Sequence, residues 1–203
     1  MICRYDKNVK FIKITTVNNR WVLLQMKKYM LDVSDYDISW PNLFEKERAR
    51  LLQKISGYDV TFEHIGGTSI TGLAAKPIID IALGIEDFSL AELLVKKIQS
   101  LEYNYEPDMV DIYPGFKFLW KGQKLNGSFD IHMYHVSIQS RESDSWKNTL
   151  LFRNYLRTHP ESAEAYAKLK KKLSGQYLTD NARYTKDKSS FIQQILLKAK
   201  QCS

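Results

Sequence analysis

The residues best suited to chemistry begin in one short stretch, Gly66-Gly67-Thr68-Ser69. Two adjacent glycines can form a tight turn whose backbone N–H groups hold phosphate oxygens, because glycine allows a close approach and a positive φ. The hydroxyl groups of Thr68 and Ser69 would add hydrogen-bond donors to such a turn. Lys76 follows at a place where it could meet a phosphate, although surface lysines are common. The stretch therefore predicts a site that binds a phosphate or a nucleotide.

Two carboxylates, Asp80 and Asp130, are the candidate catalytic residues and the candidate ligands of a divalent cation. Asp80 stands inside the apolar run 78–83, where an ionised carboxylate is costly to bury unless it is paired or bound to a metal. Its plainer role is to cap a helix, and Asp130 could instead face solvent or pair with a lysine. Mg²⁺ held by two such carboxylates would bridge phosphate oxygens and neutralise charge during group transfer.

Histidines and a glutamate near these acids extend the set of candidate metal ligands. His132 follows Asp130 at a spacing of two, so a regular strand would place both on one face together with Tyr134. Glu63 and His64 come just before the glycine turn. A site with both nitrogen and oxygen ligands suits Mn²⁺ or Zn²⁺ better than Mg²⁺. Each histidine could equally be a packing residue.

Helices and strands that alternate along the chain must position these residues. Apolar residues at helical spacing indicate helices, and short alternating or apolar runs bounded by turn residues indicate strands. The pattern predicts, in order, a helix over 41–56, a strand from Val60 into the two glycines, a buried strand over 78–83, a helix from Ser89 to near Tyr103, strands around 116–121 and 127–136, and helices over 144–157, 160–173 and 186–200.

This order of elements predicts an α/β protein of the α+β type, with a mixed β-sheet flanked by helices and a helical C-terminal tail. The length of 203 residues favours one principal domain. We expect its sheet part over about 31–143 and its helical tail over about 144–203. Residues 1–30, with a strand pattern at 9–17 and a helical pattern at 20–31, form an extension whose role the sequence does not indicate.

The distribution of charge argues against sequence-specific binding of nucleic acid, in spite of a net charge of +7. Residues 1–30 hold seven basic residues and one acid, residues 31–152 hold twelve and eighteen, and residues 153–203 hold eleven and four. No single basic stripe spans the predicted domain, and a small phosphorylated ligand fits this distribution as well. The sequence indicates no oligomeric state.

Cysteine usage and hydropathy indicate the compartment. The two cysteines, Cys3 and Cys202, lie at opposite ends of the chain and far from any metal-binding spacing. No apolar run approaches the roughly 18 residues that a membrane span needs. We therefore expect a soluble cytoplasmic protein with no membrane partner.

The segment 63–81, EHIGGTSITGLAAKPIIDI, resembles the hallmark of the GrpB family, which reads like EHIGSTSVPGLAAKPIIDI. The likeness covers roughly residues 33–200. It also includes the patterns YDxxWPxLFxxE from Tyr36, WxxxLxFRxYLRxHPE from Trp146 to Glu161, and the residues Tyr184, Lys188, Phe191 and Ile192. The resemblance implies a nucleotidyltransferase-like fold, in which a glycine–serine turn follows one strand and catalytic acids stand on the next.

Two positions depart from what the resemblance implies. Gly67 stands where the second residue of the turn is usually serine, so a phosphate contact from that side chain is lost. Ala82 follows Asp80 at the spacing where the second acid of a catalytic pair would stand. The resemblance therefore leaves the catalytic role of this strand incomplete.

Two functions remain open at this point. The first is a metal-dependent transferase that moves a nucleotidyl group from a nucleoside triphosphate to an unidentified acceptor. The second is a non-catalytic module that binds a nucleotide or phosphorylated metabolite, and related domains do occur fused to dephospho-CoA kinases. Carboxyl groups of Asp80 and Asp130 about 3–5 Å apart would favour metal chemistry. Side chains on different faces would favour the binding module.

Overall fold

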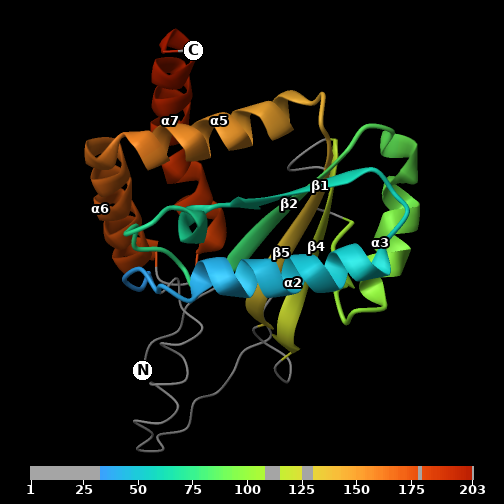
Figure 1. Cartoon of the computed structure of the whole chain (residues 1–203). Helices are drawn as coiled ribbons and strands as arrows, with labels where there is room; N and C mark the ends of the chain where they lie inside the picture. Colours follow the sequence, from blue (N-terminus) through green and yellow to red (C-terminus); the bar gives the residue numbers. More distant parts are fainter. Residues whose placement is uncertain (1–32, 108–114, 125–129, 178–179, 203) are drawn as a thin grey trace, which may run out of the picture.

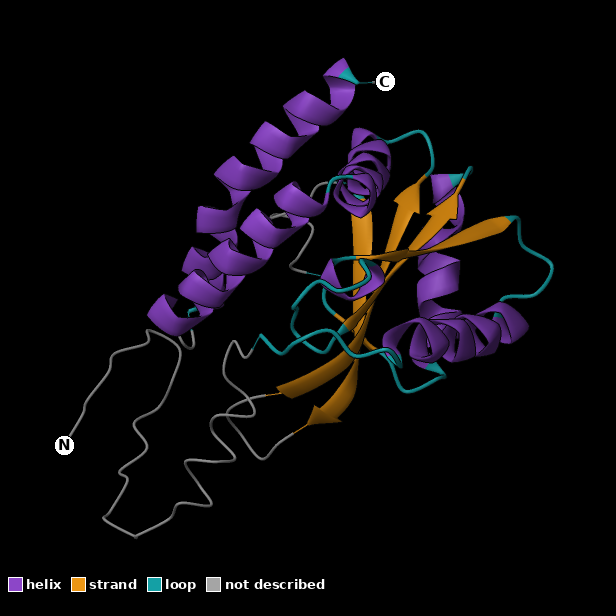
Figure 2. Cartoon of the chain, turned by 60° about the vertical axis from the view of Figure 1, so that its left-hand side comes forward, coloured by secondary structure: helices purple, strands orange, loops and turns teal. Residues whose placement is uncertain are grey.

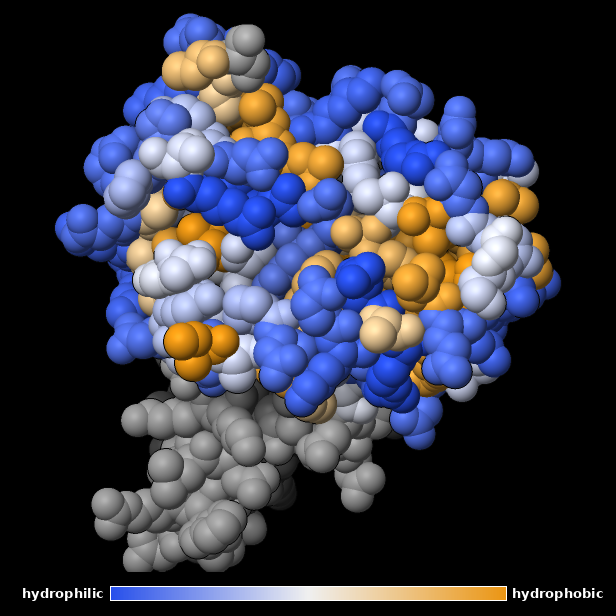
Figure 3. Space-filling model, in the orientation of Figure 1, coloured by the Kyte–Doolittle hydropathy of each residue, from blue (hydrophilic) through white to orange (hydrophobic). Residues whose placement is uncertain are grey.

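The computed structural model describes residues 33–107, 115–124, 130–177 and 180–202. They form a five-stranded sheet with helices on both faces (Figure 1). The strand predicted at 9–17 and the helix predicted at 20–31 lie outside the described residues. Within the described ranges, the helices lack the length and apolar character that crossing a membrane requires. The face of the molecule in Figure 3 is mainly hydrophilic, with apolar side chains in separate patches.

The sheet has the strand order β1-β2-β5-β4-β3 and mixes parallel with antiparallel pairs. β2 (Ile79–Ile85) lies antiparallel to β1 (Val60–Ile65) and parallel to β5 (Asp130–Ser140). β4 (Phe116–Lys124) is antiparallel both to β5 and to β3 (Asn104–Tyr105). The predicted mixed sheet is thus confirmed. The short strand β3 is an addition that the sequence pattern does not predict.

One face of the sheet carries the main apolar core and packs against two helices, α2 (Trp40–Lys54) and α3 (Ala91–Gln99). The core includes Ile81 and Leu83 of β2 and Val136 of β5. Because successive side chains of a strand point to opposite faces, the residues between these core positions face the other side of the sheet. That second face is where the candidate site lies.

The loop from the first strand to the second holds a 3₁₀ turn, η1 (Gly67–Ser69), directly after Gly66. The helix predicted to start at Ser89 is preceded by a second 3₁₀ turn, η2 (Phe88–Leu90). The side chain of Asp87 accepts a hydrogen bond from the backbone N–H of Ser89 at the start of this turn.

Three helices of the C-terminal tail lie across the second face of the sheet (Figure 2). They are α5 (Asp144–Thr158), α6 (Pro160–Tyr177) and α7 (Asn181–Gln201). A second apolar cluster joins Leu156, Tyr166 and Ile195 of these helices to Ile70 and Leu73 of the loop after β1. The predicted α/β class with a helical C-terminal tail is therefore confirmed, and the tail packs on the loop that carries the glycines.

Candidate functional site

A cleft of about 740 Å³ lies between the second face of the sheet and the helical tail. The residues that line it include Gly66, Gly67, Lys76, Asp80, His132, His135, Tyr166, Lys170, Tyr184 and Lys188. They come from the loop after β1, from β2 and β5, and from α6 and α7. The tertiary structure thus brings the glycine turn and Asp80 together with residues from the far end of the chain.

The carboxylate of Asp80 lies against the backbone of Gly66. Its backbone has a φ of +68° and a ψ of −172°, a region that is essentially restricted to glycine. A Cβ atom at this position would lie 2.1 Å from Oδ2 of Asp80. The side chain of Asp80 is 32% exposed, so it lines the cleft as a half-buried group. The space that glycine leaves at position 66 is therefore filled by a carboxylate.

Gly67 stands in the same relation to Lys170 of α6. A Cβ atom on Gly67 would lie 2.8 Å from Nζ of Lys170 and 2.7 Å from Cβ of Ala75. Lys170 is only 4% exposed, and its Nζ has no hydrogen-bond partner among the described residues. The ammonium lies 4.8 Å from the ring centroid of Tyr166, a weak partner for a buried charge. A buried cation that lacks a strong acceptor thus stands beside the turn.

Two more lysines line the cleft next to Lys170. Nζ of Lys76 lies 4.8 Å from the ring centroid of Tyr184, and Nζ of Lys188 lies 4.4 Å from the same ring. Burial and, to a smaller extent, the positive charge of Lys188 lower the pKa of Lys170 to about 7 and that of Lys76 to about 8. Burial also lowers the pKa of Lys188. The negative charge of Asp80 acts on all three pKa values in the opposite direction.

A chain of hydrogen bonds leads away from Asp80 on the sheet side of the cleft. Nδ1 of His135 lies 2.9 Å from Oδ1 of Asp80, and Nε2 of His135 lies 2.8 Å from Nδ1 of His132. An ionised carboxylate only accepts hydrogen bonds, so Nδ1 of His135 is the donor to Asp80. In a neutral His135 the Nε2 atom then accepts from Nδ1–H of His132. The ring of His132 stacks on Trp120 with the ring centroids 4.2 Å apart.

A β-bulge brings His132 to this chain and corrects the predicted arrangement of β5. Lys121 pairs with Tyr134 whereas Gly122 pairs with His132, so Met133 is an extra residue in the strand. Such a residue reverses the alternation of faces beyond it. His132 consequently lies on the face of His135, while Tyr134 packs against the apolar core on the other face. The prediction that His132 and Tyr134 share a face is therefore wrong.

The strand register also separates Asp130 from Asp80. Asp80 pairs with His135, whereas Asp130 pairs with Lys124 at the beginning of β5. Trp120 and Lys124 of β4 pair with His135 and Asp130, so Asp130 lies four steps along the sheet from the partner of Asp80, which corresponds to roughly 13 Å at about 3.3 Å per residue. The backbone does not bring the two acids to the separation of about 3–5 Å that a shared cation needs.

The described residues do not fit the predicted metal site. They contain no group of three or more histidine, cysteine, aspartate or glutamate residues that could hold a metal ion. Glu63 forms an ion pair with Arg153. His64 stacks on Phe44 at a centroid distance of 4.7 Å, and burial lowers its pKa to about 4. The tertiary structure thus directs two of the predicted ligands to partners elsewhere.

The hydroxyl groups of the turn are likewise used inside it. The Thr68 hydroxyl donates to the carbonyl oxygen of Ile78 and therefore accepts from Nε2–H of His64, at 3.1 and 3.0 Å. The Ser69 hydroxyl donates to the carbonyl oxygen of Gly66 at 2.7 Å. Both residues are buried, and neither lines the cleft. In this conformation they shape the turn, which corrects the prediction that they offer donors to a phosphate.

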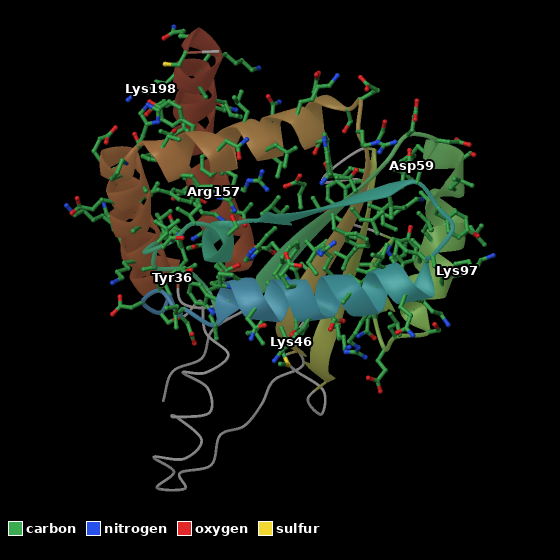
Figure 4. All side chains as sticks on the ribbon, in the orientation of Figure 1. Tyr36, Lys46, Asp59, Lys97, Arg157 and Lys198 are labelled. Carbon is green, nitrogen blue, oxygen red and sulfur yellow. The ribbon has the colours of Figure 1, made fainter. Side chains whose placement is uncertain are left out.

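Two arginines of α5 hold the turn from the side of the tail. Nε and Nη2 of Arg157 donate to the carbonyl oxygen of Ser69 at 3.1 and 2.8 Å. Nη1 of Arg153 donates to the carbonyl oxygen of His64 at 2.9 Å. Figure 4 shows the labelled Arg157 reaching from α5 toward the turn. The position of the glycines thus depends on the packing of the tail.

The sequence interpretation missed Lys170 as a candidate site residue, although one signal was available. Lys170 follows Tyr166 at a spacing of four, and Lys188 follows Tyr184 at the same spacing. Residues four apart lie on one face of a helix, where an aromatic ring can cover an ammonium group. The repeated Tyr-x-x-x-Lys pattern in two neighbouring helices therefore points to two lysines that face one cleft.

Comparison with known proteins places the chain in a family. Residues 30–198 match the family model described as GrpB protein. The chain is 33% identical to the glutamate-rich protein GrpB of Alkalihalophilus pseudofirmus, over 78% of this chain and 89% of that protein. It is 32% identical to a UPF0157 protein of Halalkalibacterium halodurans, over 81% and 80% of the two chains. The chain therefore belongs to the GrpB family.

A solved structure agrees with this assignment. The crystal structure of the conserved protein GrpB from Enterococcus faecalis superimposes with a TM-score of 0.72 and 32% identity, covering 83% of this chain and 96% of that chain. A structure of the Cid1 poly(U) polymerase gives a TM-score of 0.44 and 12% identity, over 76% and 47% of the two chains. This second likeness is too low to support an inference about activity.

Proposed function

We propose that the cleft binds the phosphate groups of a nucleoside triphosphate or a related phosphorylated metabolite. The observation that carries the proposal is the buried ammonium of Lys170, which lies beside the glycine turn without a hydrogen-bond acceptor among the described residues. An unpaired buried cation is unfavourable, and a bound anion would remove that cost. Lys76 and Lys188 line the same cleft and would add two further charge-assisted contacts.

The size of the cleft supports a ligand of nucleotide size. Its volume of about 740 Å³ lies within the range that small-molecule sites usually occupy, roughly 300–1,000 Å³. The wall formed by β4 carries Phe116 and Phe118, which offer apolar surface to a base or another organic group. Phosphate recognition by lysines on one side and apolar contact on the other is consistent with a nucleotide lying across the sheet.

Catalysis of nucleotidyl transfer is a second proposal, and it rests on the chain from Asp80 through His135 to His132. A transfer reaction requires a group that accepts the proton of the attacking hydroxyl. Asp80 fixes the orientation of His135, and Nε2 of His135 holds His132, so His132 is suited to that role in the cleft. Release of pyrophosphate from a nucleoside triphosphate would support catalysis. Binding without any turnover would support the non-catalytic module.

Calorimetric titration with ATP and with inorganic triphosphate tests the proposed binding, and adenosine serves as a ligand without phosphate. We expect both phosphorylated ligands to bind and adenosine to bind much more weakly. Lys170→Met should weaken binding by about 10- to 100-fold, the usual worth of a hydrogen bond to a charged group. Lys171→Met is the matched control, since Lys171 is on the same helix but exposed and paired with Asp35. Equal affinity of Lys170→Met and the unaltered protein would contradict the proposal.

A further inference from the structure

We infer that the cleft binds its phosphorylated ligand without a divalent cation, with three lysines supplying the positive charge that a metal would otherwise supply. The inference rests on the proposed function and concerns the chemistry of the same site. The lysines are Lys76, Lys170 and Lys188, which come from three separate segments and line one cleft. A site that holds phosphates in this way recognises the free polyphosphate anion rather than its magnesium complex.

Each carboxylate named here accepts a hydrogen bond from a neighbouring ring nitrogen. Oδ1 of Asp80 accepts from Nδ1 of His135, and its Oδ2 lies over the backbone of Gly66. Glu106, which also lines the cleft, accepts a hydrogen bond of 2.8 Å from Nε1 of Trp120. Mg²⁺ is usually bound through carboxylates together with phosphate oxygens and waters. Asp80 and Glu106 are each hydrogen-bonded to a different neighbour, so they do not form a carboxylate pair that could share a Mg²⁺ ion.

The positive charges of the lysines around Asp80 disfavour binding of a divalent metal ion to its carboxylate. Lys76, Lys170 and Lys188 are each close enough to Asp80 for its charge to act on their pKa values. A divalent cation on Asp80 would therefore be repelled by the nearby ammonium groups. A polyphosphate beside the three lysines would be attracted by the same ammonium groups. The charge of the three lysines therefore favours binding of a polyphosphate over binding of a divalent cation.

The position of Lys170 explains how this site differs from one that uses a hydroxyl-bearing turn. Nζ of Lys170 lies 2.8 Å from the place where a side chain would begin on Gly67. Glycine at position 67 therefore leaves room for an ammonium group at the turn itself. The loss of a neutral donor at position 67 is offset by a charged donor from α6, which forms stronger hydrogen bonds with phosphate.

The experiment compares titration of inorganic triphosphate and of ATP in excess EDTA and in saturating Mg²⁺. We expect binding in EDTA to be at least as tight as in Mg²⁺, because Mg²⁺ neutralises the charge that the lysines recognise. Binding that appears only with Mg²⁺ would overturn the inference and leave the proposed function standing. Binding in neither condition would reject both. Thermal-shift measurements with Mg²⁺, Mn²⁺ or Zn²⁺ alone should show no stabilisation of the protein.

Two variants separate the lysine contribution from a metal contribution. Lys170→Met and Lys188→Met should each lose at least about tenfold in affinity in EDTA, and Mg²⁺ should not restore it. Lys171→Met should bind as the unaltered protein does. Circular dichroism and the melting temperature identify a variant that fails to fold. If one lysine variant fails to fold, the affinity of the other lysine variant tests the inference. Full binding by a folded lysine variant in the presence of Mg²⁺ would show that a metal supplies the charge.

Discussion

The ammonium nitrogen of Lys170 occupies the space that a side chain at position 67 would need. A Cβ atom on Gly67 would lie 2.8 Å from this nitrogen, so the turn after β1 and helix α6 of the tail are fitted to each other. Packing against Lys170 therefore explains why glycine, and not the usual serine, stands at position 67. The proposed phosphate site depends on this fit.

Gly67→Ser should therefore displace Lys170 and weaken the binding of inorganic triphosphate by about tenfold or more, as Lys170→Met does. The new side chain would also meet Ala75, so we expect a loss of about 1–3 kcal/mol in the free energy of unfolding. Gly175→Ala in α6 is the control, since no atom of the described residues lies within 4 Å of a Cβ there. Calorimetry and urea denaturation measure the two effects. Unchanged affinity in Gly67→Ser would contradict the proposed role of Lys170.

Gly66→Ala should destabilise the protein by two separable effects. The positive φ costs an alanine about 1–3 kcal/mol, and the clash with Oδ2 of Asp80 adds to it. Asp80→Ala removes the carboxylate but leaves the backbone unchanged. A double-mutant cycle should therefore show a smaller effect of Gly66→Ala in the Asp80→Ala background, by about 1 kcal/mol or more. Strict additivity would indicate that the two residues are not in contact.

The stability of the protein should rise with pH between about 7 and 10. Burial lowers the pKa of Lys170 from 10.5 to about 7 and that of Lys76 from 10.5 to about 8. In this window the unfolded chain binds more protons than the folded chain, so the free energy of unfolding increases with pH. The charged and titratable groups around Lys170 are Asp80, His135, Tyr166, Tyr184, Lys76 and Lys188. Lys170→Met should flatten the increase, while Lys171→Met should leave it unchanged.

Affinity for inorganic triphosphate should show the opposite trend. The lysines lose their charge as pH rises through about 7 to 9, so the attraction for the anion weakens. Titrations across this range should give a dissociation constant that increases with pH. An affinity that is constant from pH 7 to 9 would contradict the assignment of these lysines to phosphate binding.

Arg157→Met should loosen the glycine turn without altering the cleft directly. Arg157 donates two hydrogen bonds to the carbonyl oxygen of Ser69, and their loss leaves that buried acceptor unsatisfied. We expect a decrease of about 1–3 kcal/mol in the free energy of unfolding and faster amide hydrogen exchange over residues 66–70. Arg183→Met is the control, because Arg183 is exposed on α7 and pairs with Asp180. Equal rates of amide hydrogen exchange in both variants would show that Arg157 does not stabilise the turn.

The sequence by itself determined the elements whose signals are local. The apolar run of β2 and the proline at the start of α2 are patterns of a few residues, and the structure has both elements close to the predicted bounds. The order of a strand, a glycine turn and a second strand that carries Asp80 was also predicted, whereas the contact between Asp80 and Gly66 was not. The GrpB resemblance rests on the same short segment, and the family match confirms it.

Only the tertiary structure decided which side chains meet. The extra residue Met133 reverses the faces of β5, so His132 joins His135 although their spacing of three predicts opposite faces. The pairing register separates Asp130 from Asp80. A register depends on how two strands align, so it cannot be predicted from the sequence of either strand alone. Lys170 reaches Gly67 across 103 positions of chain because α6 packs on the loop after β1. Such long-range contacts depend on how whole helices and strands pack together, so a local sequence pattern does not predict them.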